Sequence, residues 1–198
     1  MSTEIVILAL AWLVALGVFI WFLWVLIPVL AGLAYVTTRP ERIIRALEMA
    51  KVCQGETVFD LGAGDGRVLV IAAKLFEARA VGIEISPFQC LAAWWNARRN
   101  RVRDQVRIRW GSFYRADLAG ADVVFAYMTS RQTERIRAVL ERKLKPGVRV
   151  VAVSFEVSGW QPDEIDEENL LFLYRMPPTP GGLTTFLLKR AAARSSQK

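Results

Sequence analysis

The sequence predicts an α/β domain with a mostly parallel sheet, preceded by one long apolar helix. No charged residue occurs from Ile5 to Val36. Short apolar segments then alternate with helix-like segments as far as Phe155, which is typical of parallel β-α-β units. Two further apolar segments, 170–175 and 183–189, are joined by a Pro/Gly-rich connection that suits an antiparallel pair of strands.

The composition limits the chemistry of the chain. Its 198 residues have room for one catalytic domain and a little extra. Histidine is absent, which excludes a Ser/His/Asp triad and leaves no basis for a metal site. Cys53 and Cys90 are far apart and without metal-ligand spacing, so a reducing compartment is compatible. The net charge of +7 favours anionic surfaces, such as lipid headgroups, nucleic acid or an acidic partner, although a merely solvated basic face stays open.

The segment from Ile5 to Val36 is long enough to span a bilayer, for which about 20 apolar residues suffice. We expect residues 1–38 to form a single-pass transmembrane anchor. A cleaved signal peptide fits less well, because the first four residues carry no positive charge and the apolar run exceeds the usual length of about 7–15 residues. A buried core helix is the other alternative.

Charges flanking the apolar segment predict its orientation. Arg39, Arg42 and Arg45 follow the segment, whereas only Glu4 precedes it. The positive-inside rule therefore places the catalytic domain on the cytoplasmic side of the membrane.

An amphipathic helix is expected next, up to about Val52. Thr37 or Thr38 is a candidate N-cap, and Pro40 suits the first turn. We expect the arginines of this helix to form a solvated face, and an interaction role is the alternative. The catalytic domain then extends over residues 39–190, and the small, polar residues 191–198 are expected to be a disordered tail.

A glycine-rich turn follows the first strand, which spans 58–61. Gly62, Gly64 and Gly66 stand at alternate positions and lead into a helix up to Phe76. Glycines permit positive φ and let a ligand approach the backbone at a helix N-terminus. The pattern therefore favours a bound nucleoside over a glycine turn without a ligand. The remaining elements are expected as strands at 80–84, 106–110, 121–127 and 148–155, a helix that begins at Pro87 and ends between Arg98 and Arg103, and a helix at 131–144.

Two acids flank these glycines in the predicted sheet. Asp60 ends the first strand and Glu84 ends the second. Together with Gly-Ala-Gly-Asp-Gly they resemble motif I and the acidic loop of the class I, seven-β-strand S-adenosylmethionine-dependent methyltransferases. The resemblance implies a Rossmann-like seven-stranded methyltransferase sheet, mostly parallel with one antiparallel strand, and S-adenosyl-L-methionine as the cofactor.

In that family the glycine turn packs against the methionine part of the cofactor and the second acid holds the ribose hydroxyls. Glu84 could instead only cap the next helix, a task that Ser86 can also fill. Ser112 stands where most members carry an acid that accepts from the adenine amino group. By resemblance, the cofactor-binding residues are Asp60, Gly62, Ala63, Gly64, Gly66, Glu84, Ser112, Phe113 and Tyr127.

The end of the fourth strand bears on the acceptor. It reads Phe125-Ala-Tyr-Met-Thr129, without the Asn/Asp-Pro-Pro-Tyr/Phe motif of enzymes that methylate adenine N6 or glutamine. The runs at 140–155 and 159–162 resemble the small membrane-anchored lysine methyltransferases, whose mitochondrial members modify the ATP synthase c-ring or the adenine nucleotide carrier. The resemblance implies a lysine of an integral membrane protein as the acceptor, and no nucleic acid. Residues expected to border the acceptor channel are Tyr127, Met128 and Thr129, with Glu156 and Trp160 across from them, each with an alternative as a strand-end or core residue.

Three other functions remain open. A phospholipid N-methyltransferase would also suit an anchored basic domain. A catalytically silent, membrane-tethered binding protein would explain the serine at position 112. An RNA methyltransferase is supported by the arginines between positions 98 and 109 and opposed by the apolar segment.

Overall fold

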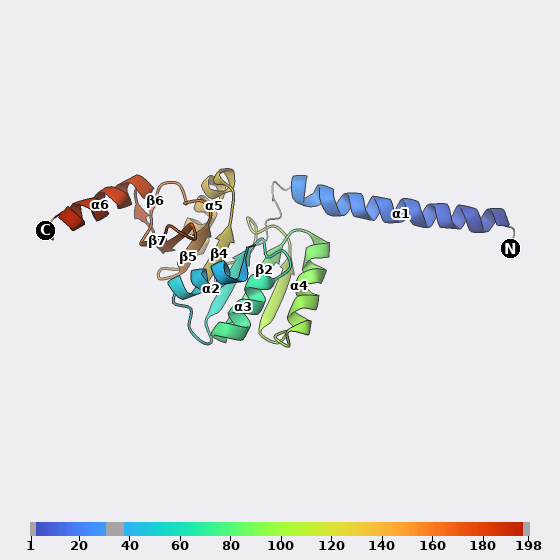
Figure 1. Ribbon diagram of the computed structural model, residues 1–198, viewed down its shortest axis with the longest axis horizontal. Coiled ribbons are helices and arrows are strands. Elements are labelled where there is room, and N and C mark those ends of the chain that lie inside the picture. Colours follow the sequence, from blue (N-terminus) through green and yellow to red (C-terminus); the bar gives the residue numbers. More distant parts are fainter. Residues whose placement is uncertain (1–2, 31–37, 196–198) are drawn as a thin grey trace. The chain divides into compact units, whose positions relative to one another are not determined.

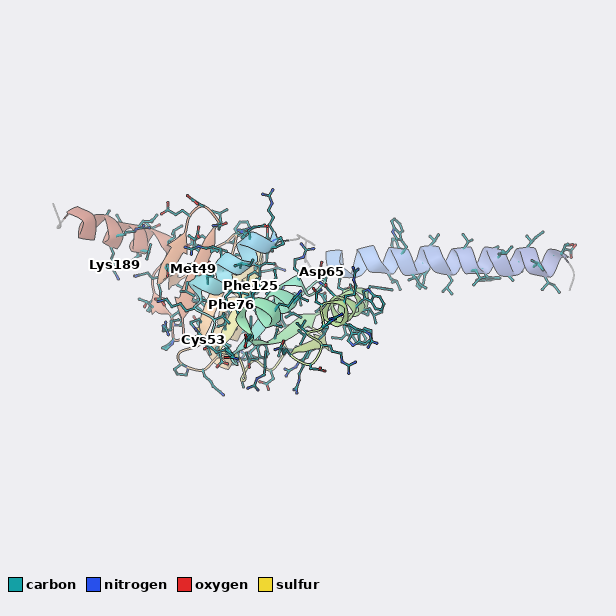
Figure 2. The ribbon with its side chains drawn as sticks, turned by 60° about the horizontal axis from the view of Figure 1, so that its bottom comes forward. Met49, Cys53, Asp65, Phe76, Phe125 and Lys189 are labelled. Atoms are coloured by element: carbon teal, nitrogen blue, oxygen red, sulfur yellow. The ribbon has the colours of Figure 1, made fainter. Side chains whose placement is uncertain are left out.

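The structure, a computed structural model, describes residues 3–30 and 38–195. The chain divides into two units, residues 1–36 and 37–198. The first contains the helix α1 (Thr3–Leu30), whose 28 residues extend over about 42 Å, more than the roughly 30 Å of a hydrocarbon core. Its stretch Thr3–Leu23 has a mean hydropathy of 2.8 and is 0% buried, with side chains projecting all round (Figure 2). A core helix would bury part of this surface, so α1 suits a membrane span by length and composition.

The second unit is built on a seven-stranded sheet of order β3-β2-β1-β4-β5-β8-β7. Strands β3, β2, β1, β4 and β5 run parallel to one another, and β8 is antiparallel to both β5 and β7. One reversed strand in a seven-stranded sheet confirms the predicted fold class. The strands are β1 (Thr57–Leu61), β2 (Arg79–Glu84), β3 (Val106–Trp110), β4 (Val123–Tyr127), β5 (Arg149–Val153), β7 (Glu164–Asp166) and β8 (Leu171–Arg175), with β6 (Trp160–Gln161) and β9 (Thr179–Pro180) forming a separate pair.

The predicted terminal hairpin was wrong in its second strand. Residues 183–189 belong to the helix α6 (Leu183–Ser195), and the antiparallel partner of β8 is the short strand β7. Leu183, Phe186 and Leu187 repeat with helical spacing, whereas β7 lies at the sheet edge and lacks an apolar run. Residues 191–195, expected to be disordered, continue α6.

The helices of the catalytic unit are α2 (Pro40–Met49), α3 (Arg67–Phe76), α4 (Pro87–Arg99) and α5 (Ser130–Lys143), in addition to α6. Figure 1 shows α2, α3 and α4 side by side over the sheet. Right-handed crossovers put α3 and α4 on one face and, because the strand order then runs the other way, α5 on the opposite face. The core on the face covered by α2, α3 and α4 contains Ile43, Leu47, Met49, Val58, Leu69, Phe125 and Val151, of which Figure 2 labels Met49 and Phe125.

The start of α2 differs from expectation by one residue. Arg39, not Thr38, holds the N-cap position, and Thr37 lies outside the described residues. Pro40 supplies the first helical residue, and the residue before a proline favours the extended conformation that Arg39 adopts.

The strand order reverses between β1 and β4. In open α/β sheets, ligands bind outside the carboxyl ends of the strands at such a reversal. A ligand site is therefore expected at the carboxyl ends of β1, β2 and β4.

Candidate active site

The glycines of the turn after β1 leave room for a ligand on one side and for helix α4 on the other. Gly62, Gly64 and Gly66 have φ values of 93°, 52° and 76°, which glycine adopts without strain. A Cβ added to Gly62 would meet nothing within 4 Å, so the space beside this residue is open to a ligand. A Cβ on Gly66 would lie 2.8 Å from that of Ala93, so here the glycine lets α3 begin in contact with α4.

Ala63 packs the turn against β2. Its side chain is buried, and a Cβ on Gly82 of β2 would lie 2.7 Å from it. The backbone N–H groups of Gly62 and Ala63 both donate to the carbonyl oxygen of Ile83, at 2.9 and 3.1 Å. These contacts fix the turn against the end of β2.

The Glu84 carboxylate holds the other side of the turn. It is buried at the end of β2, where Oε2 accepts from Gly64 N at 2.9 Å and Oε1 from Ser86 N at 2.8 Å. Each carboxylate oxygen has a further lone pair and can accept another hydrogen bond, as from a pair of hydroxyls. Ser86 Oγ accepts from Gln89 N at 3.4 Å and so caps α4, a role that Glu84 is therefore not needed to fill.

Asp60 lies just before the end of β1 and is 4% exposed. Burial, followed by the charges of Glu84 and Asp65, raises the pKa of Asp60 to about 8. A cation bound beside this side chain would favour its ionised form. The position thus suits the positively charged end of a ligand.

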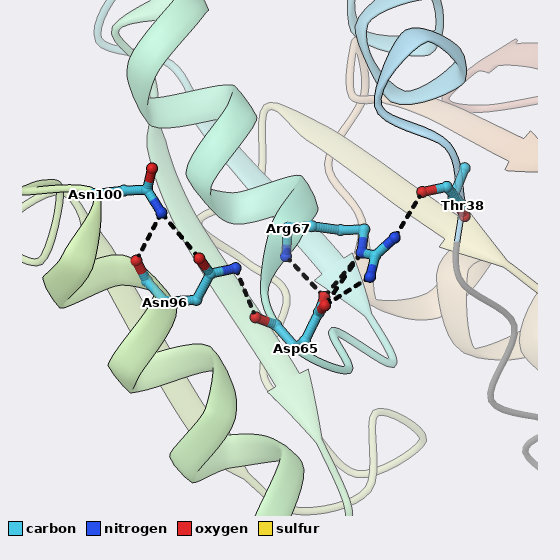
Figure 3. A network of polar contacts seen from close by, with 5 residues as sticks. All are labelled: Thr38, Asp65, Arg67, Asn96 and Asn100. Atoms are coloured by element: carbon cyan, nitrogen blue, oxygen red, sulfur yellow. Dashed lines mark hydrogen bonds and ion pairs between the residues drawn. The ribbon is translucent and has the colours of Figure 1, made fainter.

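A polar network joins the glycine turn to two other segments (Figure 3). Arg67 Nη2 contacts Asp65 Oδ2 at 2.7 Å, and Arg67 Nη1 donates to the carbonyl oxygen of Thr38 at 3.1 Å. Asn96 Nδ2 of α4 donates to the carbonyl oxygen of Asp65 at 3.1 Å, and Asn100 Nδ2 donates to Asn96 Oδ1 at 2.9 Å. The network therefore connects the turn to α4 and to Thr38, just before α2.

Tyr127 ends β4 and is half-buried. The guanidinium of Arg42 lies 5.8 Å from the centroid of its ring. Arg42 Nε donates to Asn169 O at 2.6 Å, and Nη2 donates to Ser154 Oγ at 3.0 Å. Arg42 thereby connects α2, the end of β4, and the segments after β5 and before β8.

The expectation that the arginines of α2 form a solvated face was thus wrong for Arg42, and Arg45 is likewise paired. Arg45 Nε contacts Asp166 Oδ2 at 2.7 Å. The pKa of the Asp166 carboxyl is lowered, chiefly by its hydrogen bond to Arg45. Sequence reasoning missed these contacts because the hydrogen-bond partners of Arg42 and Arg45 lie more than 100 residues away.

The other expected catalytic residues serve nearby helices or the core. Thr129 N donates to Gln132 Oε1 at 2.9 Å, as in a capping box at the start of α5. Glu156 Oε2 accepts from Leu183 N at 3.0 Å, at the start of α6.

Trp160 does not reach an exposed site. Its side chain is 1% exposed, its Nε1 donates to Glu141 Oε1 at 2.7 Å, and its ring contacts the edge of Tyr174 at a centroid distance of 5.4 Å. A buried aromatic ring with its N–H satisfied is typical of a core residue, which is the alternative given for Trp160.

Ser112 and Phe113 follow β3 beside Glu84. Gly111 N donates to the carbonyl oxygen of Glu84 at 2.8 Å, which fixes the start of their turn. Ser112 is half-buried, whereas Phe113 is buried and its ring centroid lies 4.4 Å from that of Tyr114.

Residues 60–164, more than half of the chain and the segment with the glycine turn and both acids, match the model of the ANTKMT methyltransferase domain. The chain belongs to this family. A protein-lysine N-methyltransferase of Saccharolobus islandicus is 42% identical to this ANTKMT-type chain over 133 residues, which cover 66% of the chain and 82% of that protein. The human lysine N-methyltransferase of the ATP synthase c-subunit is 25% identical over 138 residues, 70% of the chain and 58% of that protein.

A solved structure shares the fold of the ANTKMT-type domain. It is an RNA methyltransferase of Salinibacter ruber in complex with S-adenosyl-L-homocysteine, 35% identical, with a TM-score of 0.71 over 74% of this chain and 97% of that one. The match extends the methyltransferase assignment from the glycine turn to almost the whole catalytic unit.

Proposed function

We propose that this chain is a membrane-anchored, S-adenosyl-L-methionine-dependent methyltransferase that modifies lysine side chains of an integral membrane protein. The observation that carries the proposal is the buried Glu84 carboxylate on the glycine turn, beside the open space at Gly62, in a chain of this family. The protein-lysine methyltransferase relatives support the reaction class.

The residues of the site fit the cofactor. S-adenosyl-L-methionine supplies a methyl group on a positively charged sulfur. Glu84 has lone pairs left for two hydroxyl groups, and Gly62 leaves its backbone open to close approach. Asp60 offers a buried carboxylate to the ammonium group of the methionine end, which would compensate for the cost of ionising it.

A lysine acceptor must lose its proton before it can attack a methyl group. From a pKa of about 10.4, deprotonation at pH 7 costs roughly 4–5 kcal/mol. Burial beside a cation lowers the pKa of an amine and so reduces this cost, without a histidine base. The domain then has to position and desolvate the amine.

Tyr127 is the residue we assign to positioning the amine. Phe125 pairs in register with Asp60, so β4 continues past the end of β1 and brings Tyr127 toward the glycine turn. Its neighbour Arg42 restrains the ring from one side. Thr129 and Glu156 stay candidates only as residues that hold the starts of α5 and α6 near this edge.

The helix α1 supports the membrane part of the proposal. It is long and apolar enough to span a bilayer, and the arginines after it favour a cytoplasmic catalytic unit. The human relative is a lysine N-methyltransferase of the ATP synthase c-subunit, a precedent for a membrane protein as acceptor.

Incubation of the purified full-length chain with membranes and S-adenosyl-L-methionine labelled in its methyl group tests the proposal. Because small apolar proteins also enter organic solvents, both the organic phase and the protein pellet are hydrolysed in acid before analysis. Labelled methyl-lysine is the expected product. Labelled methyl-ethanolamine would instead identify a phospholipid N-methyltransferase, and cofactor binding without any labelled product would identify a silent binding protein.

A second candidate, RNA methylation, is favoured by the Salinibacter ruber structure and by the arginines between positions 98 and 109. The same incubation with total RNA in place of membranes tests it. Label in nucleosides after nuclease digestion, with none in lysine, would replace the lysine proposal.

A further inference from the structure

The helix α4 carries its large apolar side chains on the outside. Leu91, Trp94 and Trp95 are 66%, 50% and 57% exposed, whereas the residues buried against the domain are Ala93 and Ala97. A helix on the surface of a globular domain usually has the opposite pattern. Exposed large apolar groups gathered on one face mark an interaction surface.

These side chains form one continuous stripe. Positions 91, 94, 95, 98 and 99 lie three or four residues apart and so share a face of the helix. We call Leu91, Trp94, Trp95, Arg98 and Arg99 the α4 face. Its inner side has to be small because Gly66 approaches Ala93 so closely, but this requirement does not explain the two outward tryptophans.

Trp110 extends the α4 face onto the edge of the sheet. It ends the edge strand β3 and is 73% exposed. Its Nε1 donates to the carbonyl oxygen of Ile85 at 2.9 Å, which keeps the indole beside the start of α4. An indole with its N–H bonded to the protein and its ring in solvent is suited to a boundary between polar and apolar surroundings.

Positive charge accompanies these apolar groups. Helix α4 ends with Arg98 and Arg99, and Arg101 and Arg103 follow it, whereas Asp104 is the single acid in residues 87–105. Arg103 pairs with that acid at 3.3 Å, and Arg98 lies 5.7 Å from the ring centroid of Trp94. Among the described residues, no ion pair is seen for Arg98 or Arg99. The α4 face therefore combines Leu and Trp with arginines, as helices do that lie in the interface of an anionic membrane.

The length of the connection limits how far the catalytic unit can lie from α1. Helix α1 ends at Leu30 and the described part of the catalytic unit begins at Thr38. Eight residue steps span at most about 28 Å, whatever their conformation. An anchored chain can therefore bring the α4 face to the headgroups without leaving the membrane.

We propose that the α4 face, together with Trp110, binds the surface of an anionic lipid bilayer as a second membrane contact. The occupant is lipid rather than RNA because the surface is the convex outside of a helix with a leucine beside its tryptophans, whereas single-stranded nucleic acid is bound in grooves. This contact goes beyond the proposed function, since anchorage by α1 does not require it.

A fluorescent probe on the α4 face tests this proposal in the full-length chain. The probe is attached to Ala92→Cys, an exposed position on α4, after Cys53→Ser and Cys90→Ala remove the native thiols. The control probe is at Lys145→Cys, exposed in the turn before β5. Both chains are placed in nanodiscs of phosphatidylcholine alone or mixed with phosphatidylglycerol, and quenching by aqueous iodide is measured.

We expect iodide quenching at position 92 to fall about twofold or more when anionic lipid is present, and quenching at position 145 to stay unchanged. Arg98→Gln with Arg99→Gln should weaken this protection, and Leu91→Gln with Trp95→Gln should abolish it. Arg142 is exposed at the end of α5, and Arg142→Gln is the matched control, which should leave the protection at position 92 unchanged. Unchanged affinity for S-adenosyl-L-homocysteine establishes that each variant is folded.

Equal quenching at position 92 in both lipid mixtures would overturn the proposal. Protection by a single-stranded RNA oligonucleotide, without protection by lipid, would overturn it in favour of a nucleic-acid surface. Extraction of the chain from vesicles with alkaline carbonate separately tests α1. Retention of the chain with an unprotected probe refutes the α4 contact alone, whereas release of the chain with a protected probe refutes only the anchor.

Discussion

Glu84 has the most demanding surroundings of any residue in the site, because it is buried and held by two backbone N–H groups. We expect Glu84→Gln to weaken binding of S-adenosyl-L-homocysteine about tenfold to a hundredfold, since a hydrogen bond to a charged group contributes roughly 1.5–3 kcal/mol. Isothermal titration calorimetry measures the change. Glu168→Gln, exposed before β8, is the control, and the same affinity in both variants would contradict the role of Glu84.

Asp60 gives cofactor binding a pH dependence. Its pKa is raised to about 8 in the free protein, so the side chain is mostly protonated at pH 6 and mostly ionised at pH 9. Only the ionised form attracts a cation, and affinity for S-adenosyl-L-methionine should therefore rise with pH up to about 8, at most about tenfold per unit. Calorimetry at several pH values measures the rise. Asp60→Asn should flatten the pH dependence of the affinity. If the affinity of this variant still rises with pH, the rise belongs to another titrating group.

Local spacing made part of the site predictable at the residue scale. The glycines, Asp60 and Glu84 lie within one β-α-β unit, and their positions around the turn follow from their order in the sequence. Arg42 and Trp160 could not be placed in this way. Arg42 bonds to Asn169, 127 residues away, and Trp160 is paired with Glu141 of another element, so both depend on tertiary contacts that no local pattern encodes.

The contact between α3 and α4 can be tested at the scale of elements. Gly66→Ala places a Cβ 2.8 Å from that of Ala93 and forces an alanine to a φ of 76°. Positive φ alone costs an ordinary residue roughly 1–3 kcal/mol, and the clash adds to it. Thermal unfolding should therefore shift down by several degrees. Gly120→Ala, which meets nothing within 4 Å, should leave the melting temperature unchanged, and equal shifts in both would disprove the packing argument.

The attachment of α2 to the sheet depends more on Arg42 than on Arg45. Arg42 makes three hydrogen bonds to the segments after β5 and before β8, whereas Arg45 is half-exposed and makes one contact with Asp166. Arg42→Ala should lower the free energy of unfolding by about 1–3 kcal/mol, because partly buried acceptors lose their donor. Arg45→Ala should lower it less, and denaturant titration of both variants checks the order. A larger loss for Arg45→Ala would mean that the exposed Arg45–Asp166 pair is the main attachment of α2 to the sheet.

Elements with strong periodicity were predictable, and those shaped by the sheet edge were not. The five parallel strands and their helices have buried apolar runs or amphipathic spacing, and all lie where expected within a few residues. The strand β7 has only three residues, and its edge position leaves it half-polar. Residues 183–189 have enough apolar residues for either state, and their helical spacing decides in favour of α6.

At the scale of the whole molecule, the proposed membrane anchorage depends on α1. Leu13→Lys with Leu16→Lys puts two charges into the apolar stretch, and each costs about 2.5–3.5 kcal/mol near the centre of a span. The variant should be released from membranes by alkaline carbonate, whereas the unmodified chain and Leu13→Ala with Leu16→Ala should be retained. Retention of the lysine variant would show that α1 is not what holds the chain.

Mapping transferred methyl groups by mass tests the central claim most directly. Membranes are incubated with S-adenosyl-L-methionine carrying a deuterated methyl group and with either the unmodified chain or Glu84→Ala, and their proteins, lipids and RNA are analysed by mass spectrometry. The account predicts deuterated methyl groups on a lysine of an integral membrane protein, with the unmodified chain only. Deuterated methyl groups confined to lipid amines or to RNA would contradict it.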